Sequence, residues 1–293
     1  MRRFRAAAIQ PEYGELMTPD RVDAALQQLG RAELVVLPEM SHVPYFPLEP
    51  DSKDACLAVS LGSDLVASFQ QVAARHRCHL LIPIYLRDGG CRANAAVLAG
   101  PGGDLLTGRT SRDGHDLLYR KVHMCDVRLE DSGFHESAYF SPGDEYVVWD
   151  TDLGVIGVLI CYDRHFPEAW RTLRAMGTDV VCVPTTSPMR VVPTFVPEMQ
   201  AMALQQGVYI VMANRVGPQV LRTSGTTTEF LGSSCIVTPL GHVLEAAPMG
   251  RESPGVIGEL LPEALSEARY QMGFEGHRRP DTYRYEATRG RIQ

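Results

Sequence analysis

The chain has 293 residues and a mass of 32.3 kDa, which is enough for one large domain or for two domains of about 150 residues each. Its composition, 45% hydrophobic and 22% charged, is typical of a soluble globular protein and excludes a collagen-like fibre, a coiled coil and a disordered chain. The formal net charge is -7 and the basic residues form no dense run, so neither nucleic acid nor an anionic membrane is expected as a partner.

Seven cysteines are scattered along the chain, and none belongs to a Cys-x-x-Cys pair. An odd and dispersed set fits neither a disulfide framework nor a zinc ribbon, so a reducing compartment is expected. The amino-terminal segment holds only a short apolar run, Ala6–Ile9, before Gln10 and Pro11, and this run is too short for a signal peptide. No stretch approaches the ~20 apolar residues of a membrane helix. These features predict a cytoplasmic protein.

In chain order, short apolar runs rich in β-branched residues alternate with longer mixed stretches, a pattern typical of α/β architecture. The predicted strands are Ala6–Ile9, Leu34–Leu37, His79–Leu86, Ala93–Ala99, Val147–Trp149, Val155–Cys161, Val180–Val183, Tyr209–Asn214, Ser234–Thr238 and Val256–Glu259. The predicted helices are Thr18–Gly30, Leu61–His76, Glu168–Met176, Thr194–Gln206 and Pro262–Arg269.

Three turn sequences, at 87–90, 150–154 and 238–242, join neighbouring strands as hairpins, so the strands cannot form a purely parallel sheet. No linker or repeat interrupts the chain, which predicts a single domain over 1–293. The last segment, 275–293, is polar and basic, and we expect it either to be solvated or to contact a partner subunit.

The most informative segment is GVIGVLICYDRHFPEAWR, 154–171. An apolar strand leads to Cys161, a short polar turn follows, and Pro167 and Glu168 suit the first turn of a helix. A strand, nucleophile, turn and helix in this order expose a reactive atom at the carboxyl edge of a sheet. The segment therefore favours a nucleophilic thiol, and the alternative is a cysteine that only fills the core.

Two more charged residues follow apolar segments. Glu39 lies two residues beyond the run LVVL, where it could act as a general base or be a solvated loop carboxylate. Lys121 follows an apolar and aromatic stretch, although an isolated lysine is nearly always a surface charge. Neither residue indicates an activity on its own.

Taken together, LPEM around Glu39, YRKVH around Lys121 and GVLICYDRHFPE around Cys161 resemble the Glu-Lys-Cys triad of the nitrilase superfamily of carbon–nitrogen hydrolases. The segment 134–145 resembles the family loop that supplies a second glutamate, here Glu136. NRVG at 214–217 and GSSCIVTPLGHVL at 232–244 resemble the late strand and hairpin of the family.

The resemblance implies a four-layer α-β-β-α sandwich that is commonly dimerised, so we expect a homodimer or a higher homo-oligomer, with no metal and no organic cofactor. It also implies that Cys161 attacks the substrate carbon and that Glu39 takes the thiol proton. The ammonium of Lys121 and the backbone N–H of Tyr162 would stabilise the oxyanion, and Glu136 would orient Lys121 or position the substrate.

This chain departs from the family pattern in two places. The family often has Arg-Ala-x-Glu-Asn on the helix before the late strand, whereas this chain has Met202, Gln205 and Gln206 at the corresponding places, which changes a structural ion-pair position. The loop 122–137 also differs from the commoner His-Leu-Pro-Asp loop of the family. This loop borders the active site in the family, so the substrates of relatives do not transfer directly.

The best clue to the substrate is Arg164, three residues after Cys161. Its guanidinium could hold a carboxylate bidentately, and Arg164 with His165 resembles the Arg-His pair of β-ureidopropionase-like members. The alternative is that Arg164 pairs with Asp163, Glu168 or another surface carboxylate.

We also place His123 and Thr186 among the substrate-binding residues, together with Tyr162 and Arg164. Thr186 follows the predicted strand Val180–Val183 and so falls near the same edge of the sheet. His123, His135 and His165 lack the spacing of a helical ligand pair, so no metal site is expected.

The leading hypothesis is hydrolysis of an N-carbamoyl amino or β-amino acid to the amine, CO2 and ammonia. An omega-amidase-like or aliphatic amidase is the second hypothesis, because Arg164 would serve a dicarboxylate monoamide equally well. A nitrilase and a non-catalytic binding protein with the same fold are further alternatives. In each enzymatic case the partner is a small amide or nitrile.

Overall fold

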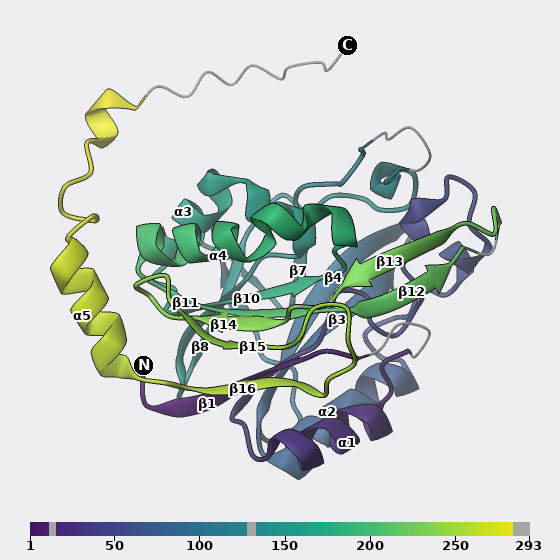
Figure 1. The fold of residues 1–293 in the computed structure, drawn as a ribbon, viewed down its shortest axis with the longest axis horizontal. Coiled ribbons are helices and arrows are strands. Elements are labelled where there is room, and N and C mark those ends of the chain that lie inside the picture. Colours follow the sequence, from purple (N-terminus) through teal and green to yellow (C-terminus); the bar gives the residue numbers. More distant parts are fainter. Residues whose placement is uncertain (12–15, 128–132, 222, 284–293) are drawn as a thin grey trace.

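A computed structural model describes residues 1–11, 16–127, 133–221 and 223–283. Within these residues the strands form two large sheets and one separate hairpin, and the first four α-helices lie on the outer faces of the large sheets, whereas the last one lies at their end (Figure 1). No helix in the described part of the chain is long and apolar enough to cross a membrane.

The first sheet has six strands and is covered by two helices. Its order is β16 (Gly255–Leu260), β1 (Phe4–Ile9), β2 (Leu34–Val36), β3 (His79–Asp88), β4 (Cys91–Ala99) and β7 (Leu118–Arg120). The covering helices are α1 (Pro19–Leu29) and α2 (Asp64–His76). The side chains of Thr18 and Ser63 cap the amino-terminal ends of α1 and α2, which explains where both helices begin.

The second sheet has eight strands. Its order is β15 (Val243–Ala246), β14 (Cys235–Val237), β11 (Tyr209–Asn214), β10 (Val180–Thr185), β9 (Gly154–Val158), β8 (Val147–Thr151), β5 (Gly108–Thr110) and β6 (His115–Asp116). The helices α3 (Pro167–Ala175) and α4 (Val192–Gln206) cover it. The hairpin of β12 (Val216–Val220) and β13 (Thr227–Leu231) is separate, and α5 (Pro262–Met272) follows β16.

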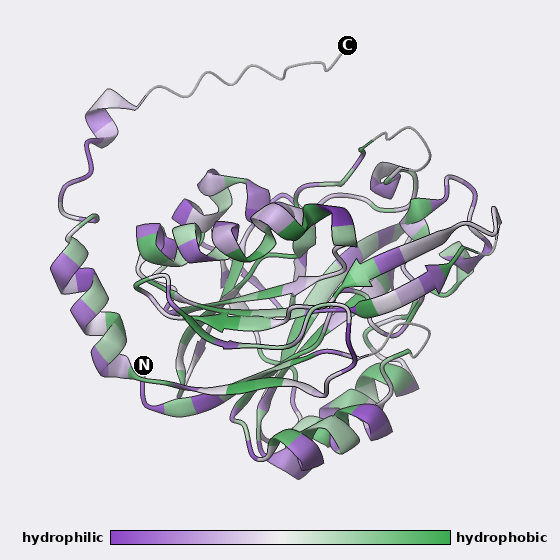
Figure 2. Ribbon diagram, viewed as in Figure 1, coloured by the Kyte–Doolittle hydropathy of each residue, from purple (hydrophilic) through white to green (hydrophobic). Residues whose placement is uncertain are grey.

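Alternation along the strands shows how the layers pack. On β1, Ala6 and Ala8 belong to the core between the sheets, whereas Ala7 and Ile9 pack under α1 and α2. On β10, Val180 and Cys182 face the first sheet, whereas Val181 and Val183 face α3 and α4. Figure 2 shows the same arrangement as hydrophobic strands between helices with hydrophilic outer surfaces. The fold is the expected four-layer α-β-β-α sandwich.

The predicted elements agree with the structure in type, with shifts at their ends. All three predicted hairpins form, as β3–β4, β8–β9 and β14–β15. The predicted strand Val155–Cys161 ends earlier, at Val158, and Cys161 instead begins a short 3-10 helix, Cys161–His165. The short strands β5, β6 and β7 and the hairpin β12–β13 were not predicted, because none has a long apolar run.

The carboxyl-terminal segment begins alongside α3. Glu275 forms two hydrogen bonds with Arg171, of 2.5 and 2.8 Å. Residues 284–293 of the predicted tail lie outside the described part of the chain, so the expected subunit contact stays a prediction. Residues 128–132 of the unusual loop 122–137 lie outside it as well.

Candidate active site

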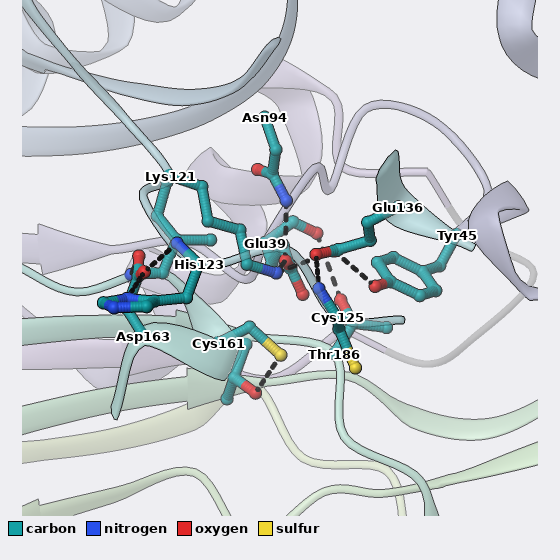
Figure 3. A network of polar contacts seen from close by, with 12 residues as sticks. Glu39, Tyr45, Asn94, Lys121, His123, Cys125, Glu136, Cys161, Asp163 and Thr186 are labelled. Carbon is teal, nitrogen blue, oxygen red and sulfur yellow. Dashed lines mark hydrogen bonds and ion pairs between the residues drawn. The ribbon is translucent and has the colours of Figure 1, made fainter. Parts of the chain in front are cut away.

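Four of the predicted site residues come together between the two sheets. Glu39 follows β2, Lys121 follows β7, Cys161 follows β9, and Glu136 begins a short 3-10 helix, Glu136–Ala138. Glu39, Lys121 and Glu136 are completely buried, and Cys161 is 8% exposed. In Figure 3, Cys161 faces the carboxylates from the side opposite Asn94. Residues far apart in the sequence therefore form one cluster.

Lys121 links the two glutamates. Its Nζ atom lies 2.7 Å from Oε1 of Glu136 and 3.0 Å from Oε1 of Glu39. Burial disfavours the ammonium charge, but Glu136 and Glu39 outweigh this effect, so the pKa of Lys121 lies well above its usual range. Burial also raises the pKa of Glu136, although Lys121 opposes the shift. The lysine is thus a fixed cation between two carboxyl groups.

Neutral side chains complete this network. Asn94 on β4 donates from Nδ2 to Oε1 of Glu39 at 2.7 Å, and the hydroxyl of Tyr45 donates to Oε1 of Glu136 at 2.7 Å. The backbone N–H of Cys125 donates to Oε2 of Glu136, also at 2.7 Å. Both oxygens of Glu136 are therefore occupied. In contrast, Oε2 of Glu39 is buried and has no hydrogen-bond partner among the described residues, so it is the carboxylate oxygen that can accept a proton.

The backbone at Cys161 is in the left-handed region, with φ of +48°. A non-glycine residue in this region costs about 1–3 kcal/mol and persists only where neighbouring contacts hold it. Asp163 supplies such contacts, because Oδ2 accepts hydrogen bonds from the backbone N–H of Ile160 at 3.1 Å and from the hydroxyl of Tyr119 at 2.7 Å. The turn thus aims the thiol away from the strand direction.

The thiol of Cys161 is protonated in the free protein near neutral pH. Burial and the negative charge of Glu39 raise its pKa to about 11, although Lys121 and Arg164 act in the opposite direction. The hydroxyl of Thr185 donates to Sγ at 3.4 Å, and Nη1 of Arg164 lies 3.9 Å from the same atom. Attack on a substrate therefore requires a base that removes the thiol proton.

The loop that carries Glu39 is held by Arg215, which follows β11. Nη2 of Arg215 donates to the carbonyl oxygens of Glu39, Met40 and Val43 at 3.0, 2.5 and 2.8 Å. Met40 has a φ of +44°, so the loop is strained immediately after Glu39. The hydroxyl of Thr186 also donates to the carbonyl oxygen of Glu39, at 3.2 Å. Thr186 thus contacts this loop, and its predicted contact with substrate stays a prediction.

His123 is directed toward Asp163. Both its backbone N–H and its Nδ1 atom lie within hydrogen-bonding distance of Oδ1 of Asp163, at 2.8 and 2.9 Å. Its ring stacks on Phe166 with centroids 3.6 Å apart. These contacts support the turn after Cys161, and Figure 3 shows His123 beside Asp163.

Arg164 is buried and paired within the protein. Its Nε atom lies 3.2 Å from Oε2 of Glu198 on α4, and its Nη1 donates to the carbonyl oxygen of Cys161 at 3.0 Å. His165 contacts the other oxygen of Glu198 at 2.6 Å. Arg164 therefore pairs with a carboxylate of the protein, as the alternative had it, but this carboxylate is Glu198, which was not named from the sequence, and Asp163 makes other contacts.

The aromatic side of the site is formed by Tyr45, Phe134, Phe230 and Tyr162. Gln219 on β12 accepts from the N–H of Tyr45 at 3.2 Å and donates to its carbonyl oxygen at 3.1 Å. These bonds fix the hairpin β12–β13 against the site. Among the described residues, no group of three or more His, Cys, Asp or Glu side chains is arranged to hold a metal ion.

Several residues of this site were not predicted from the sequence. Asn94 and Arg215 contact the Glu39 segment directly, and Glu198 lies on α4, which is separated from Cys161 by α3 and β10. One signal was present, since Asn94 is a lone amide within the apolar strand β4. A buried polar residue in such a strand needs a partner, and here the partner is Glu39.

Comparison with known proteins gives a consistent result. The carbon–nitrogen hydrolase family pattern matches residues 9–270. A nitrilase of Pyrococcus abyssi is 29% identical over 250 residues, which are 83% of this chain and 84% of that protein. An N-carbamoylputrescine amidase of Solanum tuberosum is 33% identical over 183 residues, 59% of each chain. A carbon–nitrogen hydrolase of Helicobacter pylori G27 has a similar structure, with a TM-score of 0.82, 25% identity and coverage of 96% and 97%.

Proposed function

Since this chain belongs to the carbon–nitrogen hydrolase family of the nitrilase superfamily, it is an enzyme acting on C–N bonds other than peptide bonds, and we propose that it does so through a thioester on Cys161. The observation that carries the proposal is the buried cluster of Glu39, Lys121 and Cys161. It provides a base with one unpartnered oxygen, a fixed cation and a thiol on a strained turn.

In the first half of the reaction, Oε2 of Glu39 takes the proton of Cys161 as Sγ attacks the carbonyl carbon. The oxyanion forms near the ammonium of Lys121 and the backbone N–H of Tyr162, which stabilise it electrostatically. Glu39 then gives its proton to the departing ammonia. The C–N bond breaks and a thioester remains on Cys161.

In the second half, Glu39 accepts a proton from water, and the resulting hydroxide attacks the thioester. The thiol leaves with that proton and returns to its resting state. Glu136 contacts Lys121 rather than the nucleophile, so its role is to position Lys121. With an N-carbamoyl substrate, the acid released would be a carbamic acid, which loses CO2 and yields the amine.

For the substrate, we propose an N-carbamoyl amino or β-amino acid. Arg164 supports this choice, because its guanidinium lies beside Sγ of Cys161, where the carboxylate of a short substrate could reach it. The relative from Solanum tuberosum is named for an N-carbamoyl compound, which supports recognition of the carbamoyl end.

The ion pair of Arg164 with Glu198 favours a second candidate. Because Glu198 already compensates the guanidinium charge, a small neutral amide would need no carboxylate to replace it. An aliphatic amidase acting on neutral amides is therefore the second candidate, whereas an omega-amidase-like enzyme would use Arg164 for the carboxylate of its monoamide.

An ammonia-release screen separates these candidates. The substrates are N-carbamoyl-β-alanine, N-carbamoyl-α-amino acids of both hands, glutaramate-type monoamides, neutral amides and nitriles. Highest kcat/KM on the N-carbamoyl acids supports the leading proposal, and highest kcat/KM on neutral amides contradicts it.

Glu198→Gln gives a sharper test of the carboxylate contact. This change keeps the shape of the side chain but removes the charge that competes for Arg164. If Arg164 binds the substrate carboxylate, KM for carboxylated substrates should fall by about tenfold, while KM for neutral amides should change little. Equal changes for both substrate classes would contradict a carboxylate contact with Arg164.

A further inference from the structure

A charged pocket lies away from the catalytic cluster, between α3, the carboxyl-terminal end of α4, and α5. Its volume is about 200 Å³. Figure 1 shows these three helices at the same end of the molecule. The lining residues are Arg171, Arg174, Leu204, Gln205, Gln206, Gly207, Ala268, Arg269, Met272, Phe274, Glu275 and Arg278.

The positive charges of this pocket exceed its negative charges. It is lined by four arginines and by one carboxylate, Glu275, which Arg171 contacts at 2.5 and 2.8 Å and Arg278 at 3.8 Å. Arg269 is paired at 3.0 Å with Asp179, outside the lining. Counting both carboxylates, four guanidinium groups face two negative charges.

Among the described residues, neither of these two carboxylates forms an ion pair with Arg174. Arg174 is half-buried, and its guanidinium has no hydrogen bond or ion pair with any residue in the described part of the chain. Burial and the nearby Arg269 and Arg171 lower its pKa, although Glu275 and Asp179 act in the opposite direction.

The other polar side chains that line the pocket are amides and not carboxylates. Gln205 and Gln206 line the pocket from the end of α4. Their amide N–H groups can donate to an oxyanion, and no added negative charge would repel it. Met272 and Phe274 supply an apolar side that suits a small organic group.

We propose that this pocket binds a phosphoryl group, as inorganic phosphate or as the phosphate of a small monoester. Arginine is the side chain best suited to such a ligand, because its planar N–H groups match phosphate oxygens. A dianion would balance the two uncompensated positive charges and give Arg174 a partner. The pocket belongs to the outer layer of helices and is separate from the cluster around Cys161.

The test measures binding of inorganic phosphate and of glycerol 3-phosphate by isothermal titration calorimetry, with chloride at matched ionic strength as the reference. The full chain should bind at least one of them with one site per chain. Tighter binding of the monoester would identify an organic phosphate, and equal affinity would identify inorganic phosphate as sufficient. Binding no stronger than that of chloride would overturn the proposal.

Three variants locate the site. Arg174→Gln should weaken binding by about tenfold or more, since it removes one charged hydrogen-bond donor. Gln205→Glu should weaken it similarly, because it adds a carboxylate to the pocket without removing an arginine. Arg112→Gln is the matched control, since Arg112 is exposed and paired with Asp144 elsewhere, and it should bind like the parent chain.

Circular dichroism and the mass of the assembly in solution accompany each titration. The proposal predicts that folding and assembly stay unchanged in Arg174→Gln and Gln205→Glu while binding is lost. If both variants bind like the parent, or if they alter the assembly without altering binding, the pocket is not a phosphate site.

Discussion

The catalytic cluster and the arginine pocket both contain several charged side chains, but they differ in how their cations are paired with carboxylates. In the cluster, the cation of Lys121 is fully buried and contacts both Glu39 and Glu136. In the pocket, Arg174 is half-buried and has no such partner among the described residues. A buried ion that loses its partner costs several kcal/mol, whereas a partly solvated one costs little. The cation of the cluster therefore has its counter-charges without a ligand, whereas Arg174 in the pocket has no ion-pair partner among the described residues.

The largest expected effect comes from removing the cation of the cluster. Lys121→Met leaves Glu39 and Glu136 buried without a counter-charge, so the free energy of unfolding should fall by about 3–5 kcal/mol near pH 8. In this variant Glu136 keeps the burial that raises its pKa and loses the cation that opposes the shift. The contribution of Glu136 to stability is present at low pH and is lost as pH rises, so the deficit should shrink toward pH 5.

Urea denaturation of the parent chain and Lys121→Met at pH 5 and pH 8 measures this effect. Arg112→Gln serves as the surface control, with an expected change within about 0.5 kcal/mol. A deficit of the same size at both pH values would show that the two carboxylates are not held by Lys121.

The protonation of Cys161 gives the next test of the cluster. Because burial and Glu39 raise the pKa of this thiol to about 11, the thiolate fraction should increase about tenfold per pH unit from pH 7 to pH 10. The rate of iodoacetamide labelling of Cys161, followed by peptide mass mapping, should rise in parallel.

The exposed Cys56 and Cys91 are the internal reference for this labelling. Near pH 7, Cys161 should react more slowly than either of them. A labelling rate for Cys161 that is constant from pH 7 to pH 10 would mean that the thiolate already exists in the free enzyme.

The smallest expected effects come from substituting one arginine in each region, Arg215 beside the cluster and Arg174 in the pocket. Arg215 donates to three carbonyl oxygens around Glu39, whereas Arg174 donates to none among the described residues. Arg215→Lys should cost about 1.5–3 kcal/mol of stability and lower kcat by about tenfold, with KM nearly unchanged, because it loosens the Glu39 loop. Arg174→Gln should change stability by less than about 0.5 kcal/mol and leave kcat unchanged.

Denaturation and steady-state kinetics on both variants check this contrast. If Arg215→Lys alters KM but not kcat, Arg215 contacts substrate instead of positioning Glu39. If Arg174→Gln destabilises the chain as much as Arg215→Lys, the pocket is a structural element and the two regions do not differ as described.

The sequence predicted the parts of the molecule that have local signals. The strands and helices follow from apolar periodicity, and the grouping of Glu39, Lys121 and Cys161 follows from their resemblance to the triad of the nitrilase superfamily. It did not predict that Arg164 would pair with Glu198, or that Arg215 would hold the loop after β2. These contacts join segments that only the fold brings together. A turn after Cys161 was predicted, but the left-handed backbone of Cys161 itself was not, since a positive φ at a cysteine leaves no mark in composition.

The thioester on Cys161 can be tested most directly by trapping it. The enzyme is mixed with the best substrate of the ammonia screen, quenched in acid within the first turnovers, digested and analysed by mass spectrometry. The expected result is an acyl adduct on the peptide that contains Cys161, unchanged in Cys125→Ser and absent in Cys161→Ala, whose turnover should fall by about 10⁴-fold or more. Turnover retained in Cys161→Ala, or an adduct on Cys125 instead, would contradict the assignment of Cys161 as the nucleophile.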